Sequence, residues 1–133
     1  MPLDLSSLGN AVVRLREGLS RHLREPADEQ LRDGLIQRFE FTYELTHKTL
    51  RRYLRDVAAS PDEEPLSFAD LVRTGIGRGL LRADLPAWRA FRDMRTRTSH
   101  TYSAETASRV VAGIPDFLAE AEHLLAELRR RLA

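Results

Sequence analysis

The stretch DGLIQRFEFTYELTHKTLRRYL, residues 33–54, decides the fold class. Apolar side chains recur along it every three or four residues, which is the spacing of one face of an α-helix. The same spacing reaches back to Asp28, a predicted N-cap. The apolar face consists of Leu31, Leu35, Phe39, Tyr43 or Thr42, Thr46, Leu50, Tyr53 and Val57. The stretch therefore predicts one long amphipathic helix.

A polar stripe runs beside the apolar face of this predicted helix. Its members, in steps of four and three residues, are Asp33, Gln37, Glu40, Glu44, His47 and Arg51. One interpretation is a solvated face that is braced by pairs such as Glu44 with Lys48. The other is a polar seam that faces a cleft or a partner subunit. The spacing alone leaves both interpretations open.

The segments on either side show the same helical spacing. A first helix ends before Pro26 and carries Leu5, Leu8, Val12, Leu15, Leu19 and Leu23 on one face. A short third helix begins at Ser67. We expect its end to be dissolved by the glycines at 75, 77 and 79.

Two more helices complete the pattern. Asp84 can cap a fourth helix in which Trp88 and Phe91 face inward. A last helix begins near Ser103, and its apolar side consists of Ala107, Val110, Ile114, Phe117, Ala121, Leu124 and Leu128. The chain is therefore predicted to be all-α: an antiparallel up-and-down bundle of four to five helices in one domain, residues 1–133.

Composition narrows the classes of function. The 133 residues are 42% hydrophobic and 31% charged, which suits one domain with a core. No apolar run approaches the roughly 20 residues that cross a bilayer, so we expect a cytoplasmic protein without membrane contact. The absence of cysteine excludes disulfides and thiolate chemistry. A net charge of +1 provides no global field for a long polyanion, so any contact with nucleic acid must be local.

The stretch RTRTSHTY, Arg95 to Tyr102, is a polar connection between the last two helices. Arg95 falls in the last turn of one helix, and His100 lies just before the next, whose N-terminus favours a phosphate. Histidine exchanges protons near neutral pH, and arginine holds phosphate without losing its charge. These groups suffice to cleave RNA without a metal. Alternatively, Arg95 and Arg97 cap a helix C-terminus and His100 is an ordinary loop residue.

Residues 33–54 and 95–107 together resemble the bacterial family of nucleotidyltransferase substrate-binding proteins, which belongs to the HEPN superfamily of helical bundles. The signature is an arginine, four residues, a histidine, one residue and a tyrosine, here Arg95, His100 and Tyr102. The family commonly has asparagine after the arginine, where this chain has Thr96. It also departs at His47, where we expect a large aromatic residue.

The resemblance implies a HEPN-like fold and a metal-independent endoribonuclease of the toxin type. It also implies a homodimer and a minimal nucleotidyltransferase encoded nearby as antitoxin. His100 would be the general base or acid, and Arg95 would bind the scissile phosphate. Supporting roles are then expected as follows: Tyr102, Thr96, Arg97 and Ser99 in substrate binding or modification, and Glu40 and Glu44 in orienting the arginine or the histidine.

A second interpretation of the same resemblance is a non-catalytic subunit. The bundle would then hold an acceptor, RNA or a nucleotide, for a separate nucleotidyltransferase. The sequence has no P-loop, no dinucleotide fingerprint and no nucleotidyltransferase motif, so we expect no bound cofactor. Its four histidines are scattered without ligand spacing, so no metal site is expected either.

Overall fold

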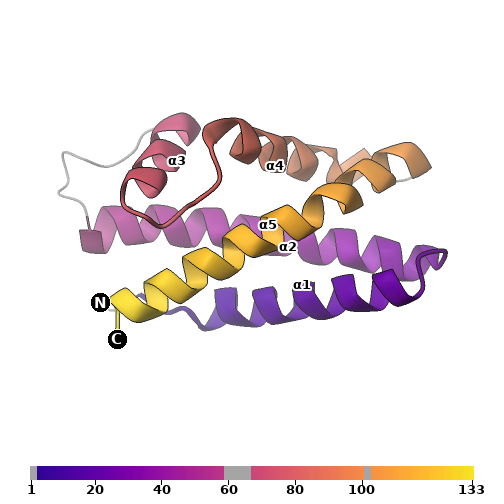
Figure 1. Cartoon of the computed structure of the whole chain (residues 1–133), viewed down its shortest axis with the longest axis horizontal. Helices are drawn as coiled ribbons and strands as arrows, with labels where there is room; N and C mark the ends of the chain where they lie inside the picture. Colours follow the sequence, from indigo (N-terminus) through magenta and orange to yellow (C-terminus); the bar gives the residue numbers. More distant parts are fainter. Residues whose placement is uncertain (1–2, 59–66, 101–102) are drawn as a thin grey trace.

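In the computed structural model, which describes residues 3–58, 67–100 and 103–133, every regular element is helical. Five α-helices of these ranges form an antiparallel bundle (Figure 1). They are α1 (Ser6–Arg24), α2 (Glu29–Tyr53), α3 (Phe68–Gly77), α4 (Leu85–Arg97) and α5 (Ala104–Arg131). A π-helical turn, Leu54–Ala58, prolongs α2, and a 3-10 turn, Thr98–His100, follows α4. The predicted all-α bundle is therefore confirmed.

Short polar side chains begin four of these helices, at the predicted positions. Each accepts a hydrogen bond from a backbone N–H in the first turn: Asp28 from Leu31, Ser67 from Asp70, Asp84 from Ala87 and Ser103 from Thr106. Such a bond satisfies one of the backbone donors that a helix start leaves without a partner. The caps therefore fix where α2, α3, α4 and α5 begin.

The end of α3 lies within the glycine run that was predicted to end the helix. The helix continues through Gly75 and ends at Gly77, so the first glycine does not break it. A Cβ atom at Gly75 would lie 2.9 Å from Cδ1 of Leu81, which shows that the absent side chain permits close packing. Gly79, with a φ of 76°, makes the left-handed turn that leads toward α4. Gly75 therefore allows close packing inside the helix, and Gly79 forms the turn after it.

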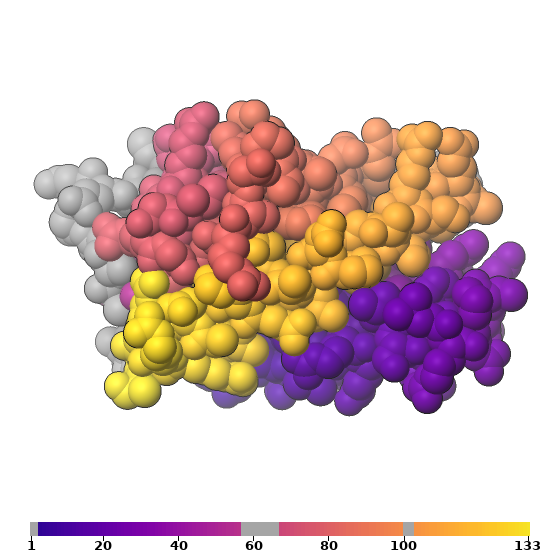
Figure 2. Space-filling view, viewed as in Figure 1, coloured from indigo at the N-terminus to yellow at the C-terminus, as the bar shows by residue number. Residues whose placement is uncertain are grey.

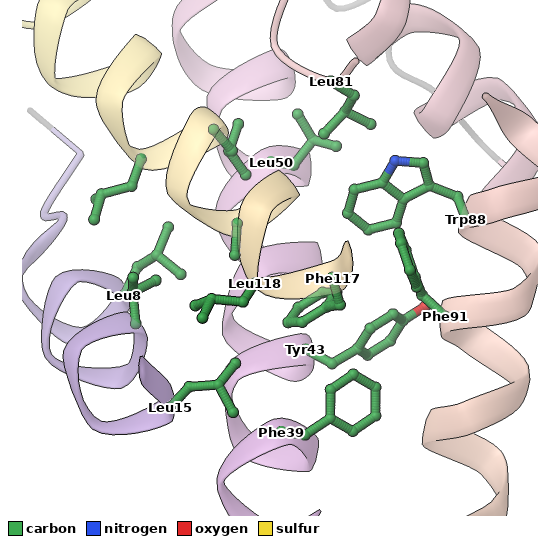
Figure 3. Close-up of a cluster of buried hydrophobic side chains, with 14 of the residues drawn as sticks. Leu8, Leu15, Phe39, Tyr43, Leu50, Leu81, Trp88, Phe91, Phe117 and Leu118 are labelled. Atoms are coloured by element: carbon green, nitrogen blue, oxygen red, sulfur yellow. The ribbon is translucent and has the colours of Figure 1, made fainter. Parts of the chain in front are cut away.

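Phe117 of α5 lies at the centre of the core and is fully buried (Figure 3). Its ring meets Phe39 edge-on, with 5.0 Å between centroids, and Phe91 at 5.5 Å. Tyr43 and Trp88 complete the ring of neighbours at 5.9 and 6.2 Å. These contacts join α2, α4 and α5, so the aromatic core sets the distance between the helices that carry the polar residues.

α5 lies across the bundle between α1 on one side and the α3–α4 pair on the other (Figure 2). α4 packs on both α5 and α2, which places its last turn against the middle of α2. Within the described ranges no helix is long and apolar enough to cross a membrane.

Candidate active site

Arg95, in the last turn of α4, is held by two carboxylates of α2. Its Nε donates to Oε1 of Glu44 at 2.7 Å, and its Nη2 lies 3.6 Å from Oε1 of Glu40. Glu40 and Glu44 are one helical turn apart, so both project from the polar stripe toward α4. The Arg95 side chain is 30% exposed, which leaves the guanidinium accessible from solvent. The polar stripe is thus a seam that faces α4 in its central part.

The residues that follow Arg95 complete the turn at the end of α4. Thr98 is buried; its Oγ1 donates to the Arg95 carbonyl at 2.7 Å and accepts from Arg95 Nη1 at 3.4 Å. Thr96 donates to the Arg92 carbonyl, and Ser99 donates to the Thr96 carbonyl. The three hydroxyl groups therefore bind carbonyl groups at the end of α4, and Thr98 also contacts the Arg95 side chain.

Arg97 points to a different partner from Arg95. It pairs with Asp93 one turn earlier on α4, with 2.8 Å between Nε and Oδ2. Both side chains are about half exposed, so this pair has the usual weak energy of a surface ion pair. The structure thus separates the two arginines of the motif: Arg95 joins α4 to α2, whereas Arg97 remains on its own helix.

His100 is the last residue of the 3-10 turn that follows α4, three residues before Ser103, the cap of α5. This backbone position agrees with the expectation that it precedes the last helix. The side chain of His100 is not among the described parts, and Tyr102 lies outside the described residues altogether.

Two aromatic side chains of α2 lie close to the glutamates: Tyr43 directly precedes Glu44, and His47 is the next member of the polar stripe. Burial raises the pKa of Tyr43 to about 12, while the nearby charges of Arg92 and Arg95 act in the opposite direction. Burial and the charge of Arg51 lower the pKa of His47. The position at which we expect a large aromatic residue is therefore filled by a largely neutral imidazole, whose ring packs against Tyr43.

Two neighbours of the seam were missed by sequence analysis. Arg92 precedes Arg95 by one turn of α4, and its Cζ lies 4.2 Å from the ring centroid of Phe68 at the start of α3. The spacing of three residues from Arg95 could have identified Arg92. Nothing in the sequence around Phe68 connects it to the motif, because only tertiary packing brings α3 to α4.

A shallow groove of about 470 Å³ lies on the other side of α2, against α1. Arg14, Gln37 and Phe41 are among its lining residues, and Phe41 is 62% exposed. Gln37 of the polar stripe thus faces this groove. Among the described residues no group of three or more histidine, aspartate or glutamate side chains could hold a metal ion.

Two features of the structure point to one class of protein: the all-helical bundle, and the arginine at the end of α4 that two carboxylates of α2 hold. A family model described as "Nucleotidyltransferase substrate binding protein like" matches residues 3–130. The chain belongs to this family.

Relatives and solved structures support the same assignment. The chain is 46% identical over 99 residues to a protein of Haemophilus influenzae named "Probable ribonuclease HepT", a match that covers 74% of this chain and 67% of that protein. A solved structure from the same species, described as the substrate-binding domain of a nucleotidyltransferase, superposes with a TM-score of 0.84 at 36% identity, over 95% of this chain and 99% of that one. A crystal structure from Thermus thermophilus gives a TM-score of 0.75 at 32% identity, over 92% and 98% of the two chains.

Proposed function

We propose that the protein is a metal-independent endoribonuclease of the toxin type, active in the cytoplasm and controlled by a minimal nucleotidyltransferase. The observation that carries the proposal is the position of Arg95. It is fixed by Glu40 and Glu44, remains accessible, and stands at the turn that contains His100. The 46% identity to a probable ribonuclease supports the same conclusion.

The proposed reaction uses the RNA's own 2′-hydroxyl as nucleophile. His100 takes the proton from this hydroxyl, whose oxygen then attacks the adjacent phosphorus. Arg95 stabilises the additional negative charge on the phosphorane. The bond to the 5′-oxygen breaks, the leaving oxygen takes up a proton from the imidazolium or water, and a 2′,3′-cyclic phosphate remains.

The direct test is cleavage of RNA by the purified protein in EDTA. We expect a 2′,3′-cyclic phosphate or its hydrolysis product, and no cleavage of RNA with 2′-O-methyl sugars. Arg95→Ala and His100→Ala should each reduce the rate by about a hundredfold or more. Arg109→Ala is the matched control, because Arg109 pairs with Glu105 on the surface of α5. Cleavage that requires a metal and leaves a 3′-hydroxyl would refute the mechanism.

Control by the partner enzyme is proposed to act through Tyr102. A phenol two residues after His100 is a suitable acceptor for a nucleotidyl group, and the added phosphate would repel RNA. Intact-mass measurement after incubation with the partner and ATP should show an added nucleotide monophosphate on the wild type and none on Tyr102→Phe. Silencing of the Tyr102→Phe variant by the partner and ATP would contradict this control.

A homodimer is proposed because one chain supplies one Arg95 and one His100, and a shared cleft would double that charge. The polar stripe and the exposed Phe41 beside it supply a surface for such contact. Light scattering should give twice the mass of the chain at micromolar concentration; a monomer at low salt would contradict the proposal.

The alternative function is a non-catalytic subunit that presents a substrate to a nucleotidyltransferase. The description of the Haemophilus influenzae structure as a substrate-binding domain favours it. In that case Arg95 would bind a nucleotide or RNA phosphate, and the purified protein would cleave no RNA at any concentration. The same assay with Arg95→Ala therefore separates the two functions.

A further inference from the structure

Four side chains from three helices form a layer beside Arg95, here termed the stacking layer: Tyr43 and His47 of α2, Phe68 of α3 and Arg92 of α4. The planes of Tyr43 and His47 lie 17° apart, with ring centroids separated by 6.3 Å. His47 and Phe68 are closer to parallel, at 10° and 6.4 Å. Arg92 extends the layer, since its Cζ lies 4.2 Å from the Phe68 centroid. The three rings are therefore nearly parallel, from the buried Tyr43 to the partly buried Phe68, and the exposed Arg92 lies over the last of them.

The stacking layer adjoins the phosphate-binding arginine. Arg92 and Arg95 are three residues apart on α4, which puts them on the same face of the helix. Tyr43 precedes Glu44, the residue that holds Arg95. The charges of Arg92, Arg95 and Glu44 all act on the pKa of Tyr43, and Glu44 is in direct contact with Arg95. The layer and the seam thus share α2 and α4.

The outer members of the layer are more exposed than its inner member. Tyr43 belongs to the buried aromatic core around Phe117, and Phe68 packs against that core while remaining partly buried. His47 is also only partly buried, and Arg92 is exposed. Arg95 and Arg97 both have carboxylate partners. Among the described residues, Arg92 makes no ion pair with a carboxylate, and its Cζ lies over the Phe68 ring. Its charge and its outer face are therefore available to a ligand.

RNA bases stack on aromatic rings and on guanidinium planes, and the guanidinium also attracts the phosphate. A lowered His47 pKa, caused by burial and Arg51, keeps the imidazole next to Phe68 neutral and suited to stacking. We propose that Arg92 and Phe68, backed by His47, form a stacking site for the base of the nucleotide adjoining the phosphate at Arg95. The inference rests on the proposed RNA substrate, but it concerns binding and does not require cleavage.

The test measures binding of RNA that the proposed mechanism cannot cut. A fluorescent, fully 2′-O-methylated single strand is titrated against the wild type, Phe68→Leu and Arg92→Lys. Phe68→Leu removes the ring but keeps an apolar side chain, and Arg92→Lys keeps the charge but removes the plane. Each should weaken binding by about tenfold or more. Arg24→Ala, at the exposed end of α1, is the control for loss of one positive charge and should change the affinity by less than about twofold.

Abasic substitutions in the RNA then locate the stacked base. Removing one particular base should cost the wild type about tenfold and cost the Phe68→Leu variant almost nothing, because the Phe68 ring holds the guanidinium plane on which that base stacks. If Phe68→Leu does not fold by circular dichroism, Arg92→Lys carries the comparison, since it alters only an exposed side chain. Abasic costs that are equal in the wild type and the variants would overturn the stacking site. An absence of RNA binding, including the case in which the surface binds only a protein partner, would overturn it as well.

The outcome is distinguishable from failure of the proposed ribonuclease. Phe68-dependent binding with no cleavage of unmodified RNA would leave the stacking site in place and refute the enzyme. Cleavage that depends on Arg95, without coupling between a base and Phe68 in the binding assay, would support the enzyme and refute the stacking site.

Discussion

Glu120 is expected to be a major determinant of stability, although it lies outside the proposed site. It is 5% exposed on α5, and its Oε1 accepts three hydrogen bonds. The donors are the backbone N–H of Arg82 at 3.0 Å, that of Ala83 at 2.9 Å, and Nε1 of Trp88 at 3.1 Å. One oxygen thus fastens the segment before α4, and the first turn of α4, to the middle of α5.

The cost of Glu120→Ala follows from the three donors that lose their acceptor. The indole N–H of Trp88 is buried and keeps no partner, which costs about 1–3 kcal/mol. The two backbone N–H groups are only partly buried, so water replaces part of the loss, and each costs about 1 kcal/mol. The sum is about 3–5 kcal/mol, a large share of the roughly 5–15 kcal/mol typical of a domain. Glu120→Gln keeps a carbonyl oxygen and should cost about 1 kcal/mol.

Urea unfolding followed by circular dichroism measures these differences. Glu122→Ala is the matched control, since it lies two residues away on α5 and pairs with Arg16 on the surface, where such pairs contribute about 0–1 kcal/mol. We expect the order wild type and Glu122→Ala, then Glu120→Gln, then Glu120→Ala. A Glu120→Ala variant within about 1 kcal/mol of the wild type would show that water reaches all three donors, and the reasoning would fail.

Three further predictions concern the seam. Burial raises the pKa of Tyr43 to about 12, so its contribution to stability is complete below about pH 10 and is lost as the pH rises toward 12. Between about pH 10 and 12 the free energy of unfolding should therefore fall less for Tyr43→Phe than for the wild type. The pKa of His47 is lowered in the folded state, so its contribution to the free energy of unfolding is present above about pH 6.5 and is lost as the pH falls through that lowered pKa. The stability of His47→Phe should therefore decrease less than that of the wild type as the pH falls. Glu44→Gln removes a negative charge next to Arg95, where the RNA phosphate is proposed to bind, but keeps a hydrogen-bond acceptor for Arg95. Steady-state kinetics at low salt should therefore show a KM for RNA about fivefold lower than that of the wild type. An unchanged or higher KM would contradict this prediction.

Most of the fold was predictable because local signals agreed with one another. Apolar spacing placed each helix, and short polar side chains at Asp28, Ser67, Asp84 and Ser103 marked four starts within one residue. Gly75 was misread because a glycine that opens space for Leu81 looks in sequence like a glycine that breaks a helix. The distinction depends on a neighbour that the local sequence does not reveal.

The candidate site was predictable in its motif and not in its surroundings. Arg95 and His100 were identified from chemistry and spacing, and the polar stripe pointed to Glu40 and Glu44. Sequence could not decide which basic residue the glutamates meet, because that depends on how α4 rotates against α2. The aromatic contacts of Phe117 set this rotation, and they form only in the folded bundle.

The pairing of Arg95, the proposed phosphate-binding residue, with two carboxylates orders its side chain but places negative charge beside it. A free arginine side chain loses rotamer freedom when it binds, at a cost of up to about 2 kcal/mol. Glu40 and Glu44 fix Arg95 in advance and thus reduce this cost, but their negative charges oppose the incoming phosphate. The contacts occupy Nε and part of Nη2, while the described residues give Nη1 the weak 3.4 Å contact with Thr98. The outer edge of the guanidinium can therefore still donate to a phosphate oxygen, and the positive charge of Arg92 one turn away offsets part of the repulsion.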